Sequence, residues 1–234
     1  MVRLNKYLAQ CGVCSRRDAD KLIEQSKVLV NGQIAMTGQQ IEETDTVQVG
    51  KKILQGKRDC KVLAFYKPVG VTCTERDPHA EKKIMDMIHY PERLTYAGRL
   101  DKDSEGLILL TNDGELINAM MRGANRHEKE YIVKTEKEIT PDFLEKMKKG
   151  IYLKELDITT RECEIEQIGK FTFRIILTQG VNRQIRRMCE ACGMKVKALK
   201  RIRVMNILLG DLKPGKWREV TGEELEQLRK SAGM

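Results

Sequence analysis

The apolar positions of the first fifty residues predict two short helices followed by a β-hairpin. One face of the first helix is apolar, with helical spacing at Leu4, Tyr7, Leu8 and Cys11. The second helix begins at Ser15, which can cap it because Asp18 follows three residues later. The hairpin is predicted by Asn31-Gly32, which joins two short alternating apolar segments. The order helix, helix, hairpin describes a small unit of its own.

From Lys61 onward the pattern changes, and strands mix irregularly with helices. Strands are predicted within residues 61–67, 94–98, 106–111, 128–135 and 171–178. The pattern of residues 115–121 predicts a helix after a turn, and Thr221 is expected to cap a last helix. Because strands and helices do not alternate regularly, we expect an α+β fold with a largely antiparallel mixed sheet. The charged segment 51–60 is interpreted as a linker, so the expected domains are residues 1–57 and 61–234.

Positive charge is concentrated near the C-terminal end of the chain. The whole sequence has a formal net charge of +9. Between Val181 and Arg218, eleven Lys and Arg residues face only Glu190 and Asp211, which also gives +9. The rest of the chain is therefore close to neutral. Such a segment favours a polyanionic partner, nucleic acid rather than a membrane, although a solvated charged surface is the simpler alternative.

The remaining composition indicates a cytoplasmic protein. No window has the continuous apolar length that a membrane span requires, and the first residues contain no secretion-signal pattern. The seven cysteines are an odd number and too sparse for a disulfide scaffold, which favours a reducing compartment.

Several kinds of site are disfavoured by the motifs. The two Cys-x-x-Cys pairs, Cys11/Cys14 and Cys189/Cys192, are nearly the whole chain apart, so we expect no metal. The sequence contains no phosphate-binding glycine loop and no serine-nucleophile motif. We therefore expect neither a nucleotide cofactor nor a covalent serine mechanism.

The segment 181–193 predicts an amphipathic helix with an arginine face. Its apolar stripe consists of Ile185, Met188, Cys189 and Cys192. The opposite arc consists of Arg183, Arg186 and Arg187. Three arginines on one face can bind an anion or pair with a carboxylate from elsewhere in the fold. The alternative is that all three are simply exposed to solvent.

Three further positions raise questions that local patterns leave open. Asp101 precedes the apolar run of 106–111 and is either a turn residue or a reacting group. Tyr131 shares a strand face with Val133 and Thr135, where a packing role is the usual one. Arg16 and Arg17 occupy the first turn of the second helix, against its dipole, where they suit a phosphate or simply point into water.

Five motifs recur along the chain as one ordered set. The central motif is Gly98-Arg99-Leu100-Asp101. The other motifs recur in order as "YKPVG" at 66–70, "EKEY" at 128–131, "NRQIRRM" at 182–188 and "GKWREVT" at 215–221. Residues 3–32 are similar to an S4-like RNA-binding domain. Taken together, these motifs resemble those of the RNA pseudouridine synthases that modify single sites in ribosomal RNA, and the resemblance covers nearly the whole chain.

The resemblance implies a role for particular residues. Asp101 corresponds to the required aspartate, Tyr131 to the tyrosine that stacks on the target uracil, and Arg186 to the basic residue that pairs with the aspartate. It leaves open whether Arg183 or Arg187 shares the role of Arg186. Neighbouring support is expected from Arg99, Leu100, Ile185, Arg183 and Arg187. In the S4-like module, the counterparts of RNA-facing residues are Arg3, Lys6, Ser15, Arg16, Arg17 and Lys27.

The expected function is the isomerisation of one uridine in ribosomal RNA to pseudouridine. "HEKEY" and "GRLDKDS" are most similar to enzymes acting on 23S rRNA, one type of which also accepts a tRNA. No cofactor is implied, and we expect a monomer. Asp101 could attack covalently or remove the C2′ proton, and the sequence does not choose. The alternatives are a non-catalytic ribosome-assembly factor and a metal-dependent nuclease built on Asp101, Asp103 and Asp113.

Overall fold

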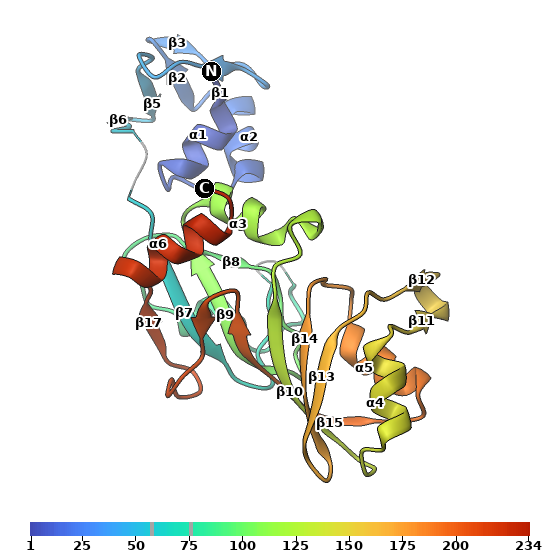
Figure 1. Cartoon of the computed structure of the whole chain (residues 1–234). Coiled ribbons are helices and arrows are strands. Elements are labelled where there is room, and N and C mark those ends of the chain that lie inside the picture. Colours follow the sequence, from blue (N-terminus) through green and yellow to red (C-terminus); the bar gives the residue numbers. More distant parts are fainter. Residues whose placement is uncertain (57–58, 75–76) are drawn as a thin grey trace. The chain divides into compact units, whose positions relative to one another are not determined.

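The computed structural model describes residues 1–56, 59–74 and 77–234, which form two compact units (Figure 1). The first unit comprises Met1–Lys61, Tyr90–Leu94 and Asn112–Gly114, and the second comprises Val62–His89, Thr95–Thr111 and Glu115–Met234. Residues 57 and 58 of the expected linker lie outside the described residues, and the domain limits stay a prediction. Over the described ranges, no helix is both long and apolar enough to cross a membrane.

The two predicted helices of the first unit are α1 (Leu4–Gln10) and α2 (Arg16–Glu24). Ser15 caps α2, because its hydroxyl oxygen accepts the N–H of Asp18 at 3.2 Å. The apolar faces of both helices pack against strands to form one core, made of Leu4, Leu8, Ala19, Ile23, Val28, Val30, Ala35, Ile41 and Val47. The apolar face that the helical spacing predicted is therefore the face that is buried.

The strands of the first unit form a four-stranded sheet and a separate pair. The sheet has the order β3-β2-β5-β6, and the pair joins β1 (Val2–Arg3) to β4 (Gln40–Ile41). The hairpin of β2 (Val28–Val30) and β3 (Gln33–Ile34) turns at Asn31 and Gly32, with φ of 52° and 79°. Such turns need positive φ at both positions, which Asn and Gly tolerate.

The last strands of that sheet extend into residues 51–60, the segment that the sequence predicts to be a linker. β5 (Val47–Val49) pairs antiparallel with β6 (Lys52–Ile53). Two residues of the expected linker therefore belong to the sheet of the first unit.

A nine-stranded mixed sheet forms the body of the second unit (Figure 1). Its main order is β13-β14-β10-β15-β9-β7-β17, with β8 added to β9 and β16 to β15. The strands are β7 (Val62–Lys67), β8 (Thr95–Ala97), β9 (Glu105–Thr111), β10 (Lys129–Thr135), β13 (Glu164–Gly169), β14 (Thr172–Leu177), β15 (Val196–Val204), β16 (Ile207–Leu208) and β17 (Trp217–Glu219). β9 and β15 pair in parallel and the other described pairs are antiparallel, which confirms the predicted fold class.

Four helices accompany this sheet: α3 (Gly114–Met121), α4 (Pro141–Lys148), α5 (Gln184–Ala191) and α6 (Gly222–Ser231). Figure 1 shows α4 and α5 beside the β13–β14 part of the sheet and α6 beside β7 and β17. The short strands β11 (Tyr152–Leu153) and β12 (Ile158–Thr159) pair near α5. The sequence did not predict α4, and Thr221 precedes α6 without a side-chain capping bond.

The parallel pairing of β9 and β15 depends on a glycine. Gly106 has a φ of +109° and pairs with Arg201 of β15. A Cβ atom at Gly106 would lie 2.2 Å from the carbonyl oxygen of Arg201, far inside van der Waals contact. Only glycine lets the two backbones approach this closely. This contact fixes β15 beside β9, and with it the position of Arg201.

Candidate active site

Asp101 lies in the loop between β8 and β9, at the start of the buried strand that the sequence predicted. Its carbonyl oxygen accepts the N–H of Ser104 at 3.1 Å, which closes a turn. The carbonyl oxygen of Lys102 accepts the N–H of Gly70 at 2.7 Å, which ties this loop to the turn after β7. The Asp101 side chain is 34% exposed, so the carboxylate faces open space on one side.

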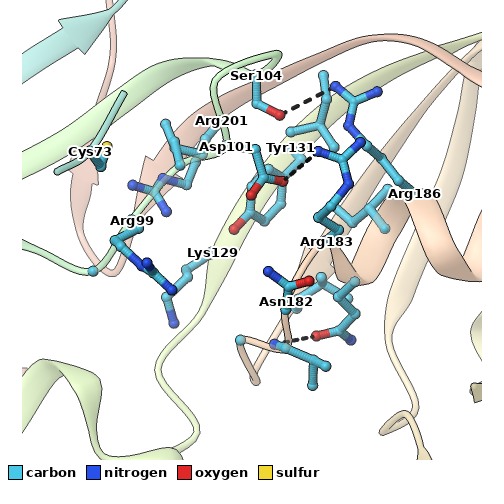
Figure 2. Close-up of a pocket in the computed structure, with 18 of the residues that line it drawn as sticks. Cys73, Arg99, Asp101, Ser104, Lys129, Tyr131, Asn182, Arg183, Arg186 and Arg201 are labelled. Atoms are coloured by element: carbon cyan, nitrogen blue, oxygen red, sulfur yellow. Dashed lines mark hydrogen bonds and ion pairs between the residues drawn. The ribbon is translucent and has the colours of Figure 1, made fainter. Parts of the chain in front are cut away.

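A cavity of about 450 Å³ opens beside Asp101. Its walls come from the loop of 98–104, strand β10, strand β15, and the segment 179–186 that leads into α5. Among the predicted residues it is lined by Arg99, Leu100, Asp101, Tyr131, Arg183, Ile185 and Arg186. The fold therefore brings these seven positions, which are spread over almost ninety residues of sequence, into one site (Figure 2). A volume of this size is in the range of pockets that hold a small ligand.

Arg183 is the arginine that reaches Asp101. Its Nη1 lies 3.8 Å from Oδ2 of Asp101. It also donates two hydrogen bonds to Asp103, from Nη1 at 3.1 Å and from Nη2 at 2.9 Å. Arg183 has a φ of 52°, the left-handed region that costs free energy for a non-glycine residue and recurs at functional sites.

Arg186 holds the neighbouring residues of the loop instead. Its Nη2 donates to the carbonyl oxygen of Asp103 at 2.8 Å and to the Ser104 hydroxyl at 3.3 Å. Its Nε lies 3.3 Å from Oδ2 of Asp103. The expected pairing of Arg186 with Asp101 is therefore not the arrangement in this structure. The reason is geometric: Arg183 precedes α5 in a left-handed conformation that directs it toward the loop, and the carboxylate closer to Arg186 is Asp103.

Asp103 is the group whose ionisation these arginines change most directly. Burial alone would raise its pKa, but the hydrogen bond from Arg183 and the charges of Arg186 and Arg183 lower the pKa below its ordinary value. In turn, the hydrogen bond to Asp103 raises the pKa of Arg183. The ionised Asp103 thus acts as an anchor that holds both arginines beside Asp101.

Tyr131 forms part of the cavity wall from strand β10. It is 9% exposed and pairs with Ile175 on one side and with Arg201 on the other. Val133 and Thr135, on the same strand face, are also buried, as the alternating pattern predicted. Figure 2 shows its ring beside Asp101.

Arg187 points away from this arrangement. Its Nε donates to the carbonyl oxygen of Asn182 at 3.2 Å, and its guanidinium forms an ion pair with Glu155. Glu155 belongs to the short 3-10 helix Lys154–Leu156 between β11 and β12. Arg187 therefore fixes the start of α5 against the β11–β12 hairpin rather than lining the cavity.

A buried lysine holds the turn after β7, and the Asp101 loop is hydrogen-bonded to this turn. Lys67 is 0% exposed, and its Nζ donates to the carbonyl oxygens of Pro68 and Val71, both at 2.8 Å. Burial lowers its pKa, while the nearby Cys73 and Asp101, among other acidic groups, act in the opposite direction. The sequence patterns predict no role for Lys67, although its place in "YKPVG" could have indicated one.

Two other residues of the cavity were missed, Lys129 and Arg201. Lys129 could have been found, because it shares a strand face with Tyr131 two residues later. Arg201 carries no local signal, because its place depends on the pairing of β15 with β9 and β10. Among the described residues, no group of three or more His, Cys, Asp or Glu side chains gathers to hold a metal.

The predicted RNA-facing residues of the first unit lie at its surface or partly exposed. Arg3, Arg16, Arg17 and Lys27 are exposed, and Lys6 and Ser15 are partly buried. Ser15 is engaged within the helix start, since its hydroxyl donates to Oδ2 of Asp18 at 2.6 Å. Arg16 and Arg17 keep their place in the first turn of α2.

Comparison with known proteins agrees with the fold. The family of RNA pseudouridylate synthases matches residues 61–191, and the S4 domain matches residues 2–47. A crystal structure of a pseudouridylate synthase superposes with a TM-score of 0.72 at 29% identity, covering 97% of this chain and 100% of the other. An N-terminal S4 domain before this catalytic fold defines an RNA-modifying enzyme. The chain belongs to the RNA pseudouridine synthase family.

Relatives indicate the part of the family to which this chain is similar. It is 44% identical over 231 residues to the dual-specificity RNA pseudouridine synthase RluF of Escherichia coli (strain K12), covering 98% of this chain and 79% of the relative. It is 38% identical over 238 residues to an uncharacterized RNA pseudouridine synthase of Aquifex aeolicus, covering 100% and 96%. It is 33% identical over 239 residues to ribosomal large subunit pseudouridine synthase B of Vibrio cholerae, covering 97% and 74%. The predicted family and enzyme class are thus confirmed.

Proposed function

We propose that this enzyme isomerises a specific uridine of 23S rRNA, with Asp101 as the reacting carboxylate and Tyr131 as the support for the base. The observation that carries the proposal is the cavity in which Asp101, Tyr131 and Arg183 meet. Arg183 lies 3.8 Å from Asp101 and, through its hydrogen bonds to Asp103, holds the loop that carries this carboxylate. The target base must leave its stack, which costs a few kcal/mol that other RNA contacts offset.

The reaction balances without an added reactant. The N1–C1′ bond breaks, the base turns, C5 bonds to C1′, the C5 proton leaves and N1 gains a proton. Asp101 begins the reaction either by bonding to the nucleotide, a bond that breaks again before the product leaves, or by removing the C2′ proton, which it returns to C2′ when C5 bonds to C1′. Tyr131 holds the detached base by stacking, and its hydroxyl assists removal of the C5 proton. These steps use the Asp101 carboxylate, the Tyr131 ring and the cavity that both of them line.

The choice of 23S rRNA is supported by the similarity to the large-subunit enzyme of Vibrio cholerae. The dual specificity in the name of the Escherichia coli relative supports a second RNA substrate, for which we propose a tRNA. Arg3, Lys6, Ser15, Arg16, Arg17 and Lys27 are the proposed RNA contacts of the S4 domain. We further infer that the enzyme works as a monomer in the cytoplasm, where these RNAs are made.

The proposal is tested by mapping pseudouridine chemically on 23S rRNA, 16S rRNA and tRNA after incubation with the wild-type enzyme. Protein-free transcripts and partly assembled large subunits serve as substrates. A new pseudouridine at one 23S position supports the assignment. Modification confined to 16S rRNA or to tRNA would contradict the assignment. Light scattering of the same protein sample tests separately whether the enzyme is a monomer.

A further inference from the structure

One side of the cavity carries a buried positive charge with an unused donor. Arg201 is 3% exposed, and its Nε donates to the carbonyl oxygen of Leu107 at 2.7 Å. Its Nη2 atom is buried and has no hydrogen-bond partner in the described part of the chain. An unpartnered buried donor costs free energy, and more so when it is charged. Because Arg201 lines the cavity, a bound ligand can supply the missing acceptor.

Lys129 adds a second cation on the same side. It occupies the same face of β10 as Tyr131, and Arg201 is the partner of Tyr131 on the adjacent strand β15. Both residues line the cavity, and burial together with the charge of Arg201 lowers the pKa of Lys129. Figure 2 shows Arg201 and Lys129, together with Arg99, on one side of Asp101, whereas Arg183 and Arg186 lie on the other.

The two acidic residues next to Lys129 in sequence are paired with other residues. Glu128 lies 3.0 Å from Nη2 of Arg203. Glu130 alternates to the opposite face of β10, where it accepts hydrogen bonds from Arg203 at 2.6 Å and from Arg174 at 3.2 Å. Among the described residues that line the cavity, the cations are Arg99, Lys102, Lys129, Arg183, Arg186 and Arg201, and the acidic residue is Asp101. Asp101 has Arg183 as its partner. The excess of positive charge therefore faces whatever occupies the cavity.

We propose that Arg201 and Lys129 bind a phosphate group of the RNA backbone next to the nucleotide in the cavity. This rests on the proposed uridine site at Asp101 and Tyr131, and it adds the contacts that position the sugar against the carboxylate. An uncharged uracil oxygen could accept from Nη2 of Arg201 but would leave both charges uncompensated. A phosphate satisfies the donor and the charge together, and guanidinium groups match its oxygens well.

The fold builds this site from strands rather than loops, which makes it rigid. Gly106 allows the backbone of Arg201 to approach β9, and the bond to Leu107 fixes its side chain. Arg201 and Lys129 are therefore positioning residues. They determine where the backbone of the bound RNA lies, while Asp101 reacts.

The direct test uses NMR of the lysine Cε signals, with Lys129 assigned from the spectrum of Lys129→Arg. The full-length protein is titrated with uridine 3′,5′-bisphosphate and, separately, with uridine. We expect the bisphosphate to raise the pKa of Lys129 and uridine to leave it unchanged. An equal response to both ligands would indicate a base contact and overturn the proposal, as would no response to the bisphosphate.

RNA binding provides a second, independent readout. Lys129→Gln is expected to lower the slope of log affinity against log salt by about 1 and to raise KM more than it lowers kcat. Lys129→Arg is expected to restore both, and Lys134→Gln, an exposed position on the same strand, to change neither. An unchanged salt slope in Lys129→Gln would contradict the phosphate contact.

Arg201→Lys tests the second cation without removing its charge from the core, and we expect an intermediate KM. The folded state of this variant is checked by circular dichroism before its KM is interpreted. The NMR and salt measurements do not require the enzyme to turn over its substrate. They therefore still test the phosphate site if the enzyme proves not to modify 23S rRNA.

Discussion

The Nη1 atom of Arg183 lies 3.8 Å from the Oδ2 atom of Asp101, while the same guanidinium donates two hydrogen bonds to Asp103. The Arg183 guanidinium is thus held by the Asp103 carboxylate and points toward the Asp101 carboxylate. The side chains are partly exposed, at 42% for Arg183 and 34% for Asp101, so solvent screens their attraction. The importance of Arg183 therefore lies in orienting the loop and the carboxylate, more than in a large electrostatic stabilisation.

Removing the anchor tests this arrangement. Asp103→Asn keeps the shape of the side chain but loses the charge that holds Arg183 and Arg186. We expect kcat to fall about tenfold, equivalent to about 1.4 kcal/mol in the activation free energy, with little change in KM. Single-turnover kinetics on the mapped RNA substrate measures the effect. Asp142→Asn, which removes an exposed ion pair with Lys146, is the matched control, and an equal loss in both variants would refute the specific role.

Two substitutions at Tyr131 separate its two proposed roles. Tyr131→Phe keeps the ring and should preserve RNA affinity while lowering kcat, because the hydroxyl no longer assists loss of the C5 proton. Tyr131→Leu removes the ring as well and should weaken binding of the flipped base by about 1–3 kcal/mol. Kd by filter binding and kcat by single turnover are compared for both. If Tyr131→Phe has the kcat of wild type, the hydroxyl has no role in the reaction and Tyr131 acts only by stacking.

The lowered pKa of Asp103 has a consequence for stability at acid pH. A carboxyl whose folded-state pKa lies below its ordinary 3.8 stabilises the folded protein above that pH, and loses this contribution as the pH falls through the folded-state value. We therefore expect wild type and Asp103→Asn to differ in unfolding midpoint by a constant amount from pH 8 to pH 5. The difference should shrink below about pH 4. A difference that shrinks already near neutral pH would be inconsistent with the ion-pair cluster.

Gly106 provides a prediction about the fold beneath the site. Gly106→Ala places a Cβ atom against the backbone of Arg201 at a φ that L-residues rarely adopt, so we expect a loss on the order of 3 kcal/mol. Gly114→Ala is the control, because nothing lies within 4 Å of its Cβ position. Urea denaturation compares the free energy of unfolding of the two variants. Equal stabilities would mean that β9 and β15 are not held together as closely as described.

Local features of the fold could be predicted because short-range chemistry determines them. The Ser15 cap and the Asn31-Gly32 turn depend on residues within a few positions of one another, and both are confirmed. The face of Tyr131 follows from strand alternation, which needs no knowledge of the partner strands. The family resemblance then supplied the grouping of Asp101 with Tyr131 and the arginines, which periodicity could not provide.

Other features depend on contacts between distant parts of the chain. Whether Arg183 or Arg186 reaches Asp101 is decided by the left-handed backbone at Arg183 and by the position of Asp103, about eighty residues away. Arg201 reaches the cavity only because β15 inserts between β9 and β10. Neither relationship leaves a pattern in the local sequence.

The most direct test of the central claim compares wild type with Asp101→Asn on the same RNA, with a chelator present throughout. Pseudouridine is mapped chemically, and RNA affinity is measured in parallel. We expect the single modification to disappear in Asp101→Asn, with a rate at least about a thousandfold lower and an affinity close to wild type. Modification by Asp101→Asn at a rate near wild type would contradict the role of this carboxylate. Tight binding without modification by either protein would instead favour a ribosome-assembly function.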